Sequence, residues 1–374
     1  MKGNWHMKKM KVAFIGAGAI SGIYLDNITK VFKNIEIAGV CDLIPERALN
    51  AKEKYNLPRV YADMYEAFND PEVDIILNLT RPYQHEQVTR EALTHGKHVY
   101  TEKPLGITIE EGRGLVRLAR EKGLMLGGAP DTVLGAGIQS CRKYIDSGMI
   151  GDVVGAAAFM ICRGHETWHP DPDFYYQAGG GPMMDMGPYY ITALVSLLGR
   201  VERLTAAGKK TFKKRLITSD PHAGETVDVA VDTYVLGMMQ FESGALASIF
   251  TTFDVYYPGQ ARLEIYGSEG TMILPDPNTF GGPIRIFRPE SGMSEELPIL
   301  FDYAKNSSGL GLADMAAAIS AGRAARAGEQ QIMHVLDVLT GFERSAKSGQ
   351  WLDMETPYTR HEPMKKAELP GRLD

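Results

Sequence analysis

The segment Thr101–Leu105 contains the lysine on which a chemical interpretation of this chain depends. Lys103 follows a short apolar run, His98–Tyr100, that is typical of a β-strand, and a nucleotide-binding pattern precedes it in the chain. Soon after it the composition changes to that of a second domain. A lysine at such a junction can face a cofactor on one side and a substrate on the other. The alternative is a surface lysine in a turn before Pro104, which is the commoner setting for an isolated Glu-Lys-Pro.

A second motif with chemical meaning lies near the N-terminus. The apolar run Met10–Ile15 leads directly into a glycine turn, residues 16–22, and a helical pattern follows through Lys30. In dinucleotide-binding sites the first glycine permits the tight bend, the second lets the backbone approach a pyrophosphate, and the helix N-terminus offers unpaired N–H groups. Ser21 stands where a third glycine is usual and is small enough for close helix–strand packing. The residues expected to contact the cofactor here are Gly16, Gly18, Ala19 and Ile20.

The expected second strand, Ile35–Cys41, ends at an aspartate, Asp42. Its distance along the chain from Gly16 is near the ~20 residues that separate such a turn from the acid that binds the adenosine ribose. A carboxylate accepts hydrogen bonds from ribose hydroxyls and repels a 2′-phosphate, so Asp42 favours NAD over NADP. Arg47 lies close by and keeps NADP open as an alternative. A turn aspartate without a cofactor role is the other alternative.

Strand-like and helix-like patterns alternate through the N-terminal part of the chain. Capping-box patterns at residues 63–66 and 108–111 open two of the helices. The later strands are expected at Val73–Leu79, Lys97–Thr101 and Leu124–Gly127. Such alternation predicts a doubly wound parallel sheet, in which ligands bind at the carboxyl ends of the strands. The polar or glycine residues that fall at expected strand ends are Gly16, Asp42, Thr80 and Lys103.

The pattern changes at Gly127–Pro130, which marks the expected domain boundary. Residues 1–128 are predicted to form a dinucleotide-binding Rossmann domain, and residues 129–374 a second, α/β domain. Alternation from Val227 to Asp232 predicts an antiparallel strand with one face to bury. Other expected strands are Ala245–Thr252, Arg262–Tyr266 and Thr271–Leu274, and the helical patterns at 309–322 and 329–348 are expected to pack back against the core.

Bulk composition excludes several classes of protein. The 374 residues are 44% apolar and 23% charged, which is ordinary for a soluble globular protein. The net charge of −6 provides no basic field for nucleic acid. The three cysteines are too few and too widely spaced for a disulfide framework, which favours the reducing cytoplasm. No apolar run approaches the ~20 residues that span a bilayer, so no membrane partner is expected.

Several motifs, in this order along nearly the whole chain, resemble the glucose–fructose oxidoreductase, inositol dehydrogenase and MocA (Gfo/Idh/MocA) family. They are the glycine turn, Thr80-x-Pro82-x-x-His85, Gly96–Val99 leading to Glu102-Lys103-Pro104, and Gly181–Tyr189. The resemblance implies a Rossmann domain followed by an α/β domain that binds substrate. The second domain would contain a large, mostly antiparallel open sheet that makes homodimer or homotetramer contacts. It also implies a nicotinamide cofactor, NAD or else NADP, and hydride exchange with a sugar, cyclitol or related polyol.

The resemblance also implies roles for single residues. Lys103 would lie beside the nicotinamide and contact the reacting hydroxyl, and Asp185 would lie in the substrate pocket. The residues that would help bind the cofactor are Glu102, Lys103, Thr80, Arg81, Pro82 and His85. Tyr189 stands where many relatives have histidine, a departure that indicates a tyrosine-containing sub-branch. Arg81 departs from the small or apolar residue that is common before the proline.

Oxidation of a secondary alcohol removes a proton from oxygen and a hydride from carbon. A tyrosine with the ordinary pKa of about 10 is a weak base near neutral pH. A lysine ammonium within ~4–6 Å can lower that pKa by roughly 1–3. On the resemblance, we expect Tyr189 to accept and donate the proton, and Lys103 to orient the hydroxyl and stabilise the alkoxide. Proton transfer by Lys103 itself and a core role for Tyr189 are the alternatives.

Residues 165–169 read His-Glu-Thr-Trp-His and match the zinc-protease string H-E-x-x-H. That motif requires a helix to place both histidines on one face, whereas Gly164 precedes the string and Pro170 follows it, so we predict no metal site. We expect a substrate loop in which Trp168 stacks against a sugar ring, with a structural aromatic loop as the alternative. The residues expected to contact substrate are Asp131, His165, Trp168 and His169. Asp131 could equally cap the helix after the turn.

The leading interpretation is an NAD(P)-dependent oxidoreductase that acts on a secondary alcohol of a polyhydroxylated small molecule. A second is an enzyme that retains its NAD and uses transient redox chemistry for sugar hydrolysis or elimination. A third is a dinucleotide-binding sensor without catalysis, which the presence of both Lys103 and Tyr189 disfavours.

Overall fold

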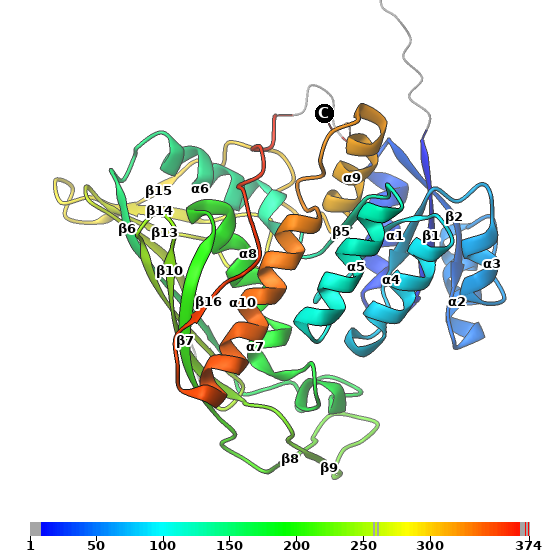
Figure 1. Ribbon diagram of the computed structural model, residues 1–374, viewed down its shortest axis with the longest axis horizontal. Coiled ribbons are helices and arrows are strands. Elements are labelled where there is room, and N and C mark those ends of the chain that lie inside the picture. Colours follow the sequence, from blue (N-terminus) through cyan, green and yellow to red (C-terminus); the bar gives the residue numbers. More distant parts are fainter. Residues whose placement is uncertain (1–8, 257–258, 260–261, 367–370, 372, 374) are drawn as a thin grey trace, which may run out of the picture.

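The computed structural model describes residues 9–256, 259, 262–366, 371 and 373, and its two large sheets occupy different halves of the chain (Figure 1). The N-terminal sheet has five parallel strands in the order β2-β1-β3-β4-β5. Its strands are β1 Met10–Ile15, β2 Ile35–Cys41, β3 Ile75–Asn78, β4 His98–Thr101 and β5 Leu126–Gly128. The helices between them are α1 Ser21–Lys30, α2 Pro45–Tyr55, α3 Met64–Asn69, α4 His85–Thr94 and α5 Ile109–Glu121. This is the predicted Rossmann-like arrangement.

Local signals account for these elements well. The first turns of α3 and α5 are both capped as their sequences predict. The Glu66 N–H donates to the side chain of Asp63 at 2.9 Å, and the Glu111 N–H donates to that of Thr108 at 3.2 Å. The β3 strand, which pairs with strands on both sides, is wholly buried. It is shorter than expected, because Val73, Asp74 and Leu79 lie outside the strand.

The C-terminal half contains a nine-stranded sheet in the order β15-β14-β13-β12-β6-β11-β10-β7-β16. Its strands are β6 Val153–Ile161, β7 Val201–Lys209, β10 Tyr234–Phe241, β11 Leu246–Thr252, β12 Arg262–Gly267, β13 Thr271–Ile273, β14 Ile284–Phe287, β15 Ser294–Leu297 and β16 Leu352–Asp353. Only the β6–β11 pairing is parallel among these described strands. The sheet is therefore mostly antiparallel, as predicted. Its inner face carries α6 Ala136–Asp146, α7 Gly181–Asp185 and α8 Gly187–Leu198.

The strand predicted at 227–232 is wrong in length. Only β9, Thr226–Asp228, is a strand, and it pairs with β8, Lys214–Leu216, in a separate two-stranded sheet. The next residues leave the ladder, because the Ala230 N–H donates to the carbonyl oxygen of Tyr176 at 2.8 Å. Val227 in β9 and Val229 in the loop after it are both buried. Burial of the loop residue therefore continued the alternation beyond the end of the strand.

The two C-terminal helices join the halves of the molecule. Helix α10, Glu329–Ser348, contacts β7 and α8 on one side and α5 and β5 on the other, and in Figure 1 it runs between the two sheets. Helix α9, Leu310–Ala321, also contacts β5. The domain boundary after residue 128 stays a prediction, although β5 ends there. Within the described residues, no helix combines the length and apolar character needed to cross a membrane.

Candidate active site

Lys103 and Asp185 form a largely buried ion pair between the two halves of the chain. Lys103 lies two residues past the end of β4, and Asp185 is the last residue of α7. The Lys103 Nζ donates to Oδ1 of Asp185 at 2.9 Å and to its backbone oxygen at 2.5 Å. The two side chains are 15% and 16% exposed. Tyr189, in the first turn of α8, places its ring centroid 5.1 Å from the same ammonium. The structure thus brings together the three residues predicted to be catalytic.

Charge and burial set the protonation states of this trio. Burial favours a lower pKa for Lys103, but the nearby charges, Asp185 foremost, raise its pKa well above the ordinary value. Burial would raise the pKa of Asp185, yet Lys103 and a hydrogen bond from His165 hold it at about 2. For Tyr189, burial raises the pKa to about 12 and Lys103 offsets only part of that rise. The expected net lowering of the tyrosine pKa is therefore wrong here, because burial outweighs the ammonium.

His165 contacts the second carboxylate oxygen of Asp185. Its Nε2 lies 3.1 Å from Asp185 Oδ2, the carboxylate oxygen that Lys103 does not contact. The imidazole packs against the rings of Tyr175 and Phe253, with centroids 4.2 and 4.7 Å away. The loop that follows β6 therefore contributes directly to the ion pair, a contact that we had not predicted.

The other two residues of the predicted substrate loop lie in the same aromatic cluster. Trp168 is 61% exposed and its ring meets that of His165 edge-on at 5.2 Å. His169 accepts the Asp171 N–H on Nδ1 at 3.0 Å. Trp168 is thus free to meet a ligand, whereas His169 supports the turn that follows it.

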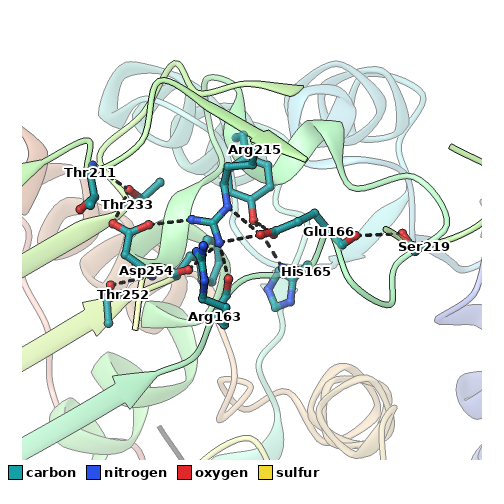
Figure 2. Close-up of polar contacts among 11 residues, drawn as sticks. Arg163, His165, Glu166, Thr211, Arg215, Ser219, Thr233, Thr252 and Asp254 are labelled. Carbon is teal, nitrogen blue, oxygen red and sulfur yellow. Dashed lines mark hydrogen bonds and ion pairs between the residues drawn. The ribbon is translucent and has the colours of Figure 1, made fainter. Parts of the chain in front are cut away.

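Glu166 belongs to a buried network and not to a metal site. The Arg215 guanidinium donates to Glu166 and to Asp254, each at 2.7 Å, and the Tyr176 hydroxyl also donates to Glu166. Figure 2 shows Arg215 between the two carboxylates, with His165 beside Glu166. No group of three His, Cys, Asp or Glu side chains in the described part of the chain could hold a metal ion.

The glycine turn after β1 has the shape that a dinucleotide pyrophosphate requires. Gly16 has φ +106°, and a Cβ there would lie 2.7 Å from the carbonyl oxygen of Leu79. Gly18 has nothing within 4 Å of its Cβ direction, so the backbone is open on that side. Helix α1 starts after Ile20 without a side-chain cap. These residues fit the pyrophosphate of NAD at an open helix N-terminus.

Asp42 lies beside this turn, at the end of β2. Its Oδ2 accepts the Ala17 N–H at 2.6 Å, and its Oδ1 accepts the Ile44 N–H at 2.8 Å. The carboxylate therefore stabilises the turn itself. Its predicted contact with the adenosine ribose stays a prediction.

Hydrogen bonds hold the loop after β3 in place. Thr80 donates its hydroxyl to Asn78 at 2.6 Å, and Pro82 opens a short 3₁₀ turn, Pro82–Gln84. His85 is 1% exposed. Its ring nitrogens lie 2.6 Å from the carbonyl oxygen of Pro104 and 3.0 Å from that of Thr80. His85 thus ties this loop to the segment of Lys103 and does not present its ring to the surface.

Two further predicted residues have partners that sequence reasoning missed. Arg81 forms an ion pair with Asp171 in the C-terminal half, so the two loops meet. Glu102 accepts the Tyr24 hydroxyl on Oε1 at 2.8 Å and the Lys103 N–H on Oε2 at 3.0 Å. The tyrosine of α1 therefore fixes the residue next to Lys103.

Asp131 caps a helix, but not the one considered from the sequence. Its Oδ2 accepts the N–H groups of Gly309 and Gly311 at 2.9 and 3.0 Å, at the start of α9. The side chain is 3% exposed, and burial raises its pKa to about 7. The geometry supports the capping alternative, and the predicted substrate contact would require this carboxylate to leave α9.

The fold and the turn define an NAD-binding oxidoreductase. Residues 10–128 match the family described as "Oxidoreductase family, NAD-binding Rossmann fold". Residues 138–273 match the "GFO/IDH/MocA C-terminal domain". The chain belongs to the GFO/IDH/MocA oxidoreductase family, which confirms the predicted family, enzyme class and cofactor.

Similar proteins include enzymes that act on sugars and inositols. Myo-inositol 2-dehydrogenase of Thermotoga maritima is 24% identical over 264 residues, which are 70% of this chain and 74% of that protein. D-xylose dehydrogenase of Paenarthrobacter nicotinovorans is 26% identical over 232 residues, 59% of each chain. The structure of levoglucosan dehydrogenase with NADH and L-sorbose has a TM-score of 0.82 at 18% identity, covering 93% of this chain and 99% of that one. The last comparison confirms the fold.

Proposed function

We propose that this protein is an NAD(P)-dependent dehydrogenase, with NAD as the preferred cofactor, that transfers a hydride between nicotinamide and a secondary alcohol of a sugar, cyclitol or related polyol. The observation that carries the proposal is the meeting of Lys103, Asp185 and Tyr189 at the carboxyl end of β4. In a doubly wound sheet, ligands bind at that edge. The names of the relatives support a polyol substrate class.

A bound oxidised nicotinamide would supply the acceptor for the hydride of the carbinol carbon. The residues that would hold the cofactor are Gly16, Gly18, Ala19, Ile20, Asp42, Thr80, Arg81, Pro82 and Glu102. The Lys103 ammonium binds the reacting hydroxyl and stabilises negative charge on its oxygen. Trp168, which is exposed and packs edge-on against His165, offers its face to the sugar ring.

Tyr189 accepts the hydroxyl proton. Its pKa of about 12 leaves it protonated in the resting site. To act as the base, Tyr189 first releases this proton to solvent, and the Lys103 ammonium, 5.1 Å from the ring, favours the phenolate that results. In the oxidation the phenolate takes the hydroxyl proton, and in the reverse direction the phenol returns it.

The test is a panel of D-glucose, D-xylose, myo-inositol and D-gluconate with NAD or NADP, followed by the absorbance of the reduced cofactor. With the best substrate, Tyr189→Phe and Lys103→Met are each expected to lower kcat by about 10²–10⁴-fold. Near wild-type rates in both variants would contradict the assignment. Turnover without release of free NADH would indicate the retained-cofactor enzyme, and cofactor binding without turnover would indicate a sensor.

We also propose that the outer face of the nine-stranded sheet forms a homodimer or homotetramer contact. Its exposed apolar side chains include Leu236, Met238 and Leu246, which are 48%, 53% and 59% exposed. A monomer rarely leaves such a contiguous patch in water. Sedimentation of wild type and of Met238→Glu tests this, and a monomeric wild-type protein would contradict it.

A further inference from the structure

The carboxylate of Asp185 is held from two sides, and each oxygen has its own partner. Oδ1 accepts from Lys103 at 2.9 Å, and Oδ2 lies 3.1 Å from the Nε2 of His165. The three side chains come from the segments after β4, after β6 and at the end of α7. An aspartate with a single partner could rotate about its side-chain bonds. With both oxygens engaged it cannot, so the lysine meets an acceptor of fixed direction.

The hydrogen bonding of His165 fixes which nitrogen carries the proton. A carboxylate is only an acceptor, so Nε2 must be the donor to Asp185. The other nitrogen, Nδ1, is buried and has no hydrogen-bond partner among the described residues. A proton on Nδ1 would therefore be an N–H buried without an acceptor, which is costly. The ring is 9% exposed and covered by aromatic neighbours, so it cannot turn to offer Nδ1 to a substrate.

The backbone that carries His165 is itself immobilised. The next residue, Glu166, is bound by Arg215, and the side chains of this ion pair are 6% and 2% exposed (Figure 2). Arg215 also donates to the carbonyl oxygen of Arg163 in this loop and to that of Phe253 after β11. A short loop fixed in this way holds the imidazole at one distance from Asp185.

We propose that His165 is a positioning residue for the reaction: it fixes the carboxylate of Asp185, and through it the direction of the Lys103 ammonium. This role rests on the proposed function and replaces the substrate contact that the sequence suggested. His165 touches neither the reacting carbon nor oxygen. Its loss is expected to misplace Lys103, and a displacement of about 1 Å can cost on the order of 10²-fold in rate.

Three variants test the role. His165→Phe keeps the ring and its packing but removes the donor, whereas His165→Gln returns an amide N–H near the position of Nε2. His222→Phe is the control, because His222 lies in the same half of the chain, is 43% exposed and pairs only with Glu225 among the described residues. All three are compared with wild type for thermal unfolding, NAD affinity, turnover and amine reactivity.

Amine reactivity provides a readout that needs no substrate. N-hydroxysuccinimidyl acetate at mildly alkaline pH acetylates only unprotonated amines, and peptide mass spectrometry quantifies the product at Lys103. The reactivity is expected to rise severalfold in His165→Phe and to stay near wild type in His165→Gln and His222→Phe. With a panel substrate, His165→Phe is expected to lower kcat by about 10²-fold, with NAD affinity unchanged and activity largely restored in His165→Gln. The unfolding temperature of His165→Phe is expected to fall, because the hydrogen bond to Asp185 is lost.

Equal acetylation of Lys103 in wild type and His165→Phe would overturn the proposal, and so would an unchanged kcat in His165→Phe. A glutamine variant as slow as the phenylalanine variant would also count against it, because the restored donor should suffice. If the wild-type protein turns over nothing in the panel, the proposed function fails, while the acetylation result still decides whether His165 positions Lys103.

Discussion

Two buried cation–carboxylate clusters of this protein meet at neighbouring residues and are built differently. Lys103 and His165 hold Asp185 in one cluster, and Arg215 holds Glu166 and Asp254 in the other. His165 and Glu166 are adjacent in the chain, so a single loop serves both. One cluster contains three residues predicted or proposed to act in the reaction, whereas the other contains none that sequence analysis assigned to the site.

The difference lies in how many donors each cation has engaged. The guanidinium of Arg215 binds two carboxylates and two backbone oxygens, which uses its planar fork almost fully. The ammonium of Lys103 makes two hydrogen bonds, both to Asp185, and its third N–H has no acceptor among the described residues. A cluster whose donors are almost all engaged stabilises the fold and leaves little for a ligand. A cluster with a spare donor beside Tyr189 can bind an incoming hydroxyl.

The largest expected effect is on stability, in Arg215→Met. This change leaves Glu166 and Asp254, whose side chains are 6% and 2% exposed, without their cation. Breaking a buried pair in this way costs about 3–5 kcal/mol, which urea unfolding at neutral pH would measure. Arg262→Met is the control, because the exposed Arg262–Glu264 pair is worth at most about 1 kcal/mol. Similar losses of stability in the two variants would contradict the conclusion that the Arg215 cluster stabilises the fold.

Much of the fold could be predicted because its signals are local. The five parallel strands, the caps of α3 and α5 and the glycine turn each depend on residues a few positions apart. Lys103 was found because a parallel sheet places its ligands at strand ends. Asp185 and Tyr189 came from a family resemblance, and no local pattern in the chain would have paired them with Lys103.

The rest of the site depends on contacts that no local pattern contains. Tyr24 and Glu102 are 78 residues apart, and Arg215 lies 49 residues from Glu166. The sequence does not show which distant residue an arginine or a tyrosine will contact in the folded protein. The wrong length of the strand predicted at 227–232 has a related cause. An alternating pattern predicts which residues are buried, but it does not show whether those residues form a strand or a loop. A capping role was correctly considered for Asp131, but the helix that it caps is α9, whose N-cap residue Gly309 lies 178 residues later in the chain.

Replacement of the Lys103 ammonium by a guanidinium tests whether the Lys103 cluster acts in the reaction. Lys103→Arg keeps the charge opposite Asp185, so unfolding is expected to change little. The wider, planar guanidinium cannot place a single N–H on the reacting hydroxyl as an ammonium does, and kcat is expected to fall by about 10²-fold or more. Arg262→Lys, at an exposed pair, serves as the matched exchange and should leave turnover unchanged. A fully active Lys103→Arg would show that charge alone suffices.

The smallest expected effect concerns the pH dependence that Asp185 gives to stability. Its folded-state pKa of about 2 lies below the ordinary value of 3.8. A depressed carboxyl pKa contributes stability that is present above the ordinary value and is lost as the pH falls through the folded value. The shift corresponds to about 2 kcal/mol lost between pH 5 and pH 2. Urea unfolding of wild type and Asp185→Asn across this range should show their difference shrink by that amount.

The comparison with Asp185→Asn is necessary because Asp131 acts in the opposite direction. Burial raises the pKa of Asp131 to about 7, so its contribution is present at acid pH and is lost as the pH rises through that value. Both proteins in the comparison retain Asp131, and its effect cancels in their difference. A difference that stays constant from pH 5 to pH 2 would mean that Lys103 and His165 do not stabilise the charge on Asp185, and the active cluster would then lack the fixed carboxylate on which its chemistry depends.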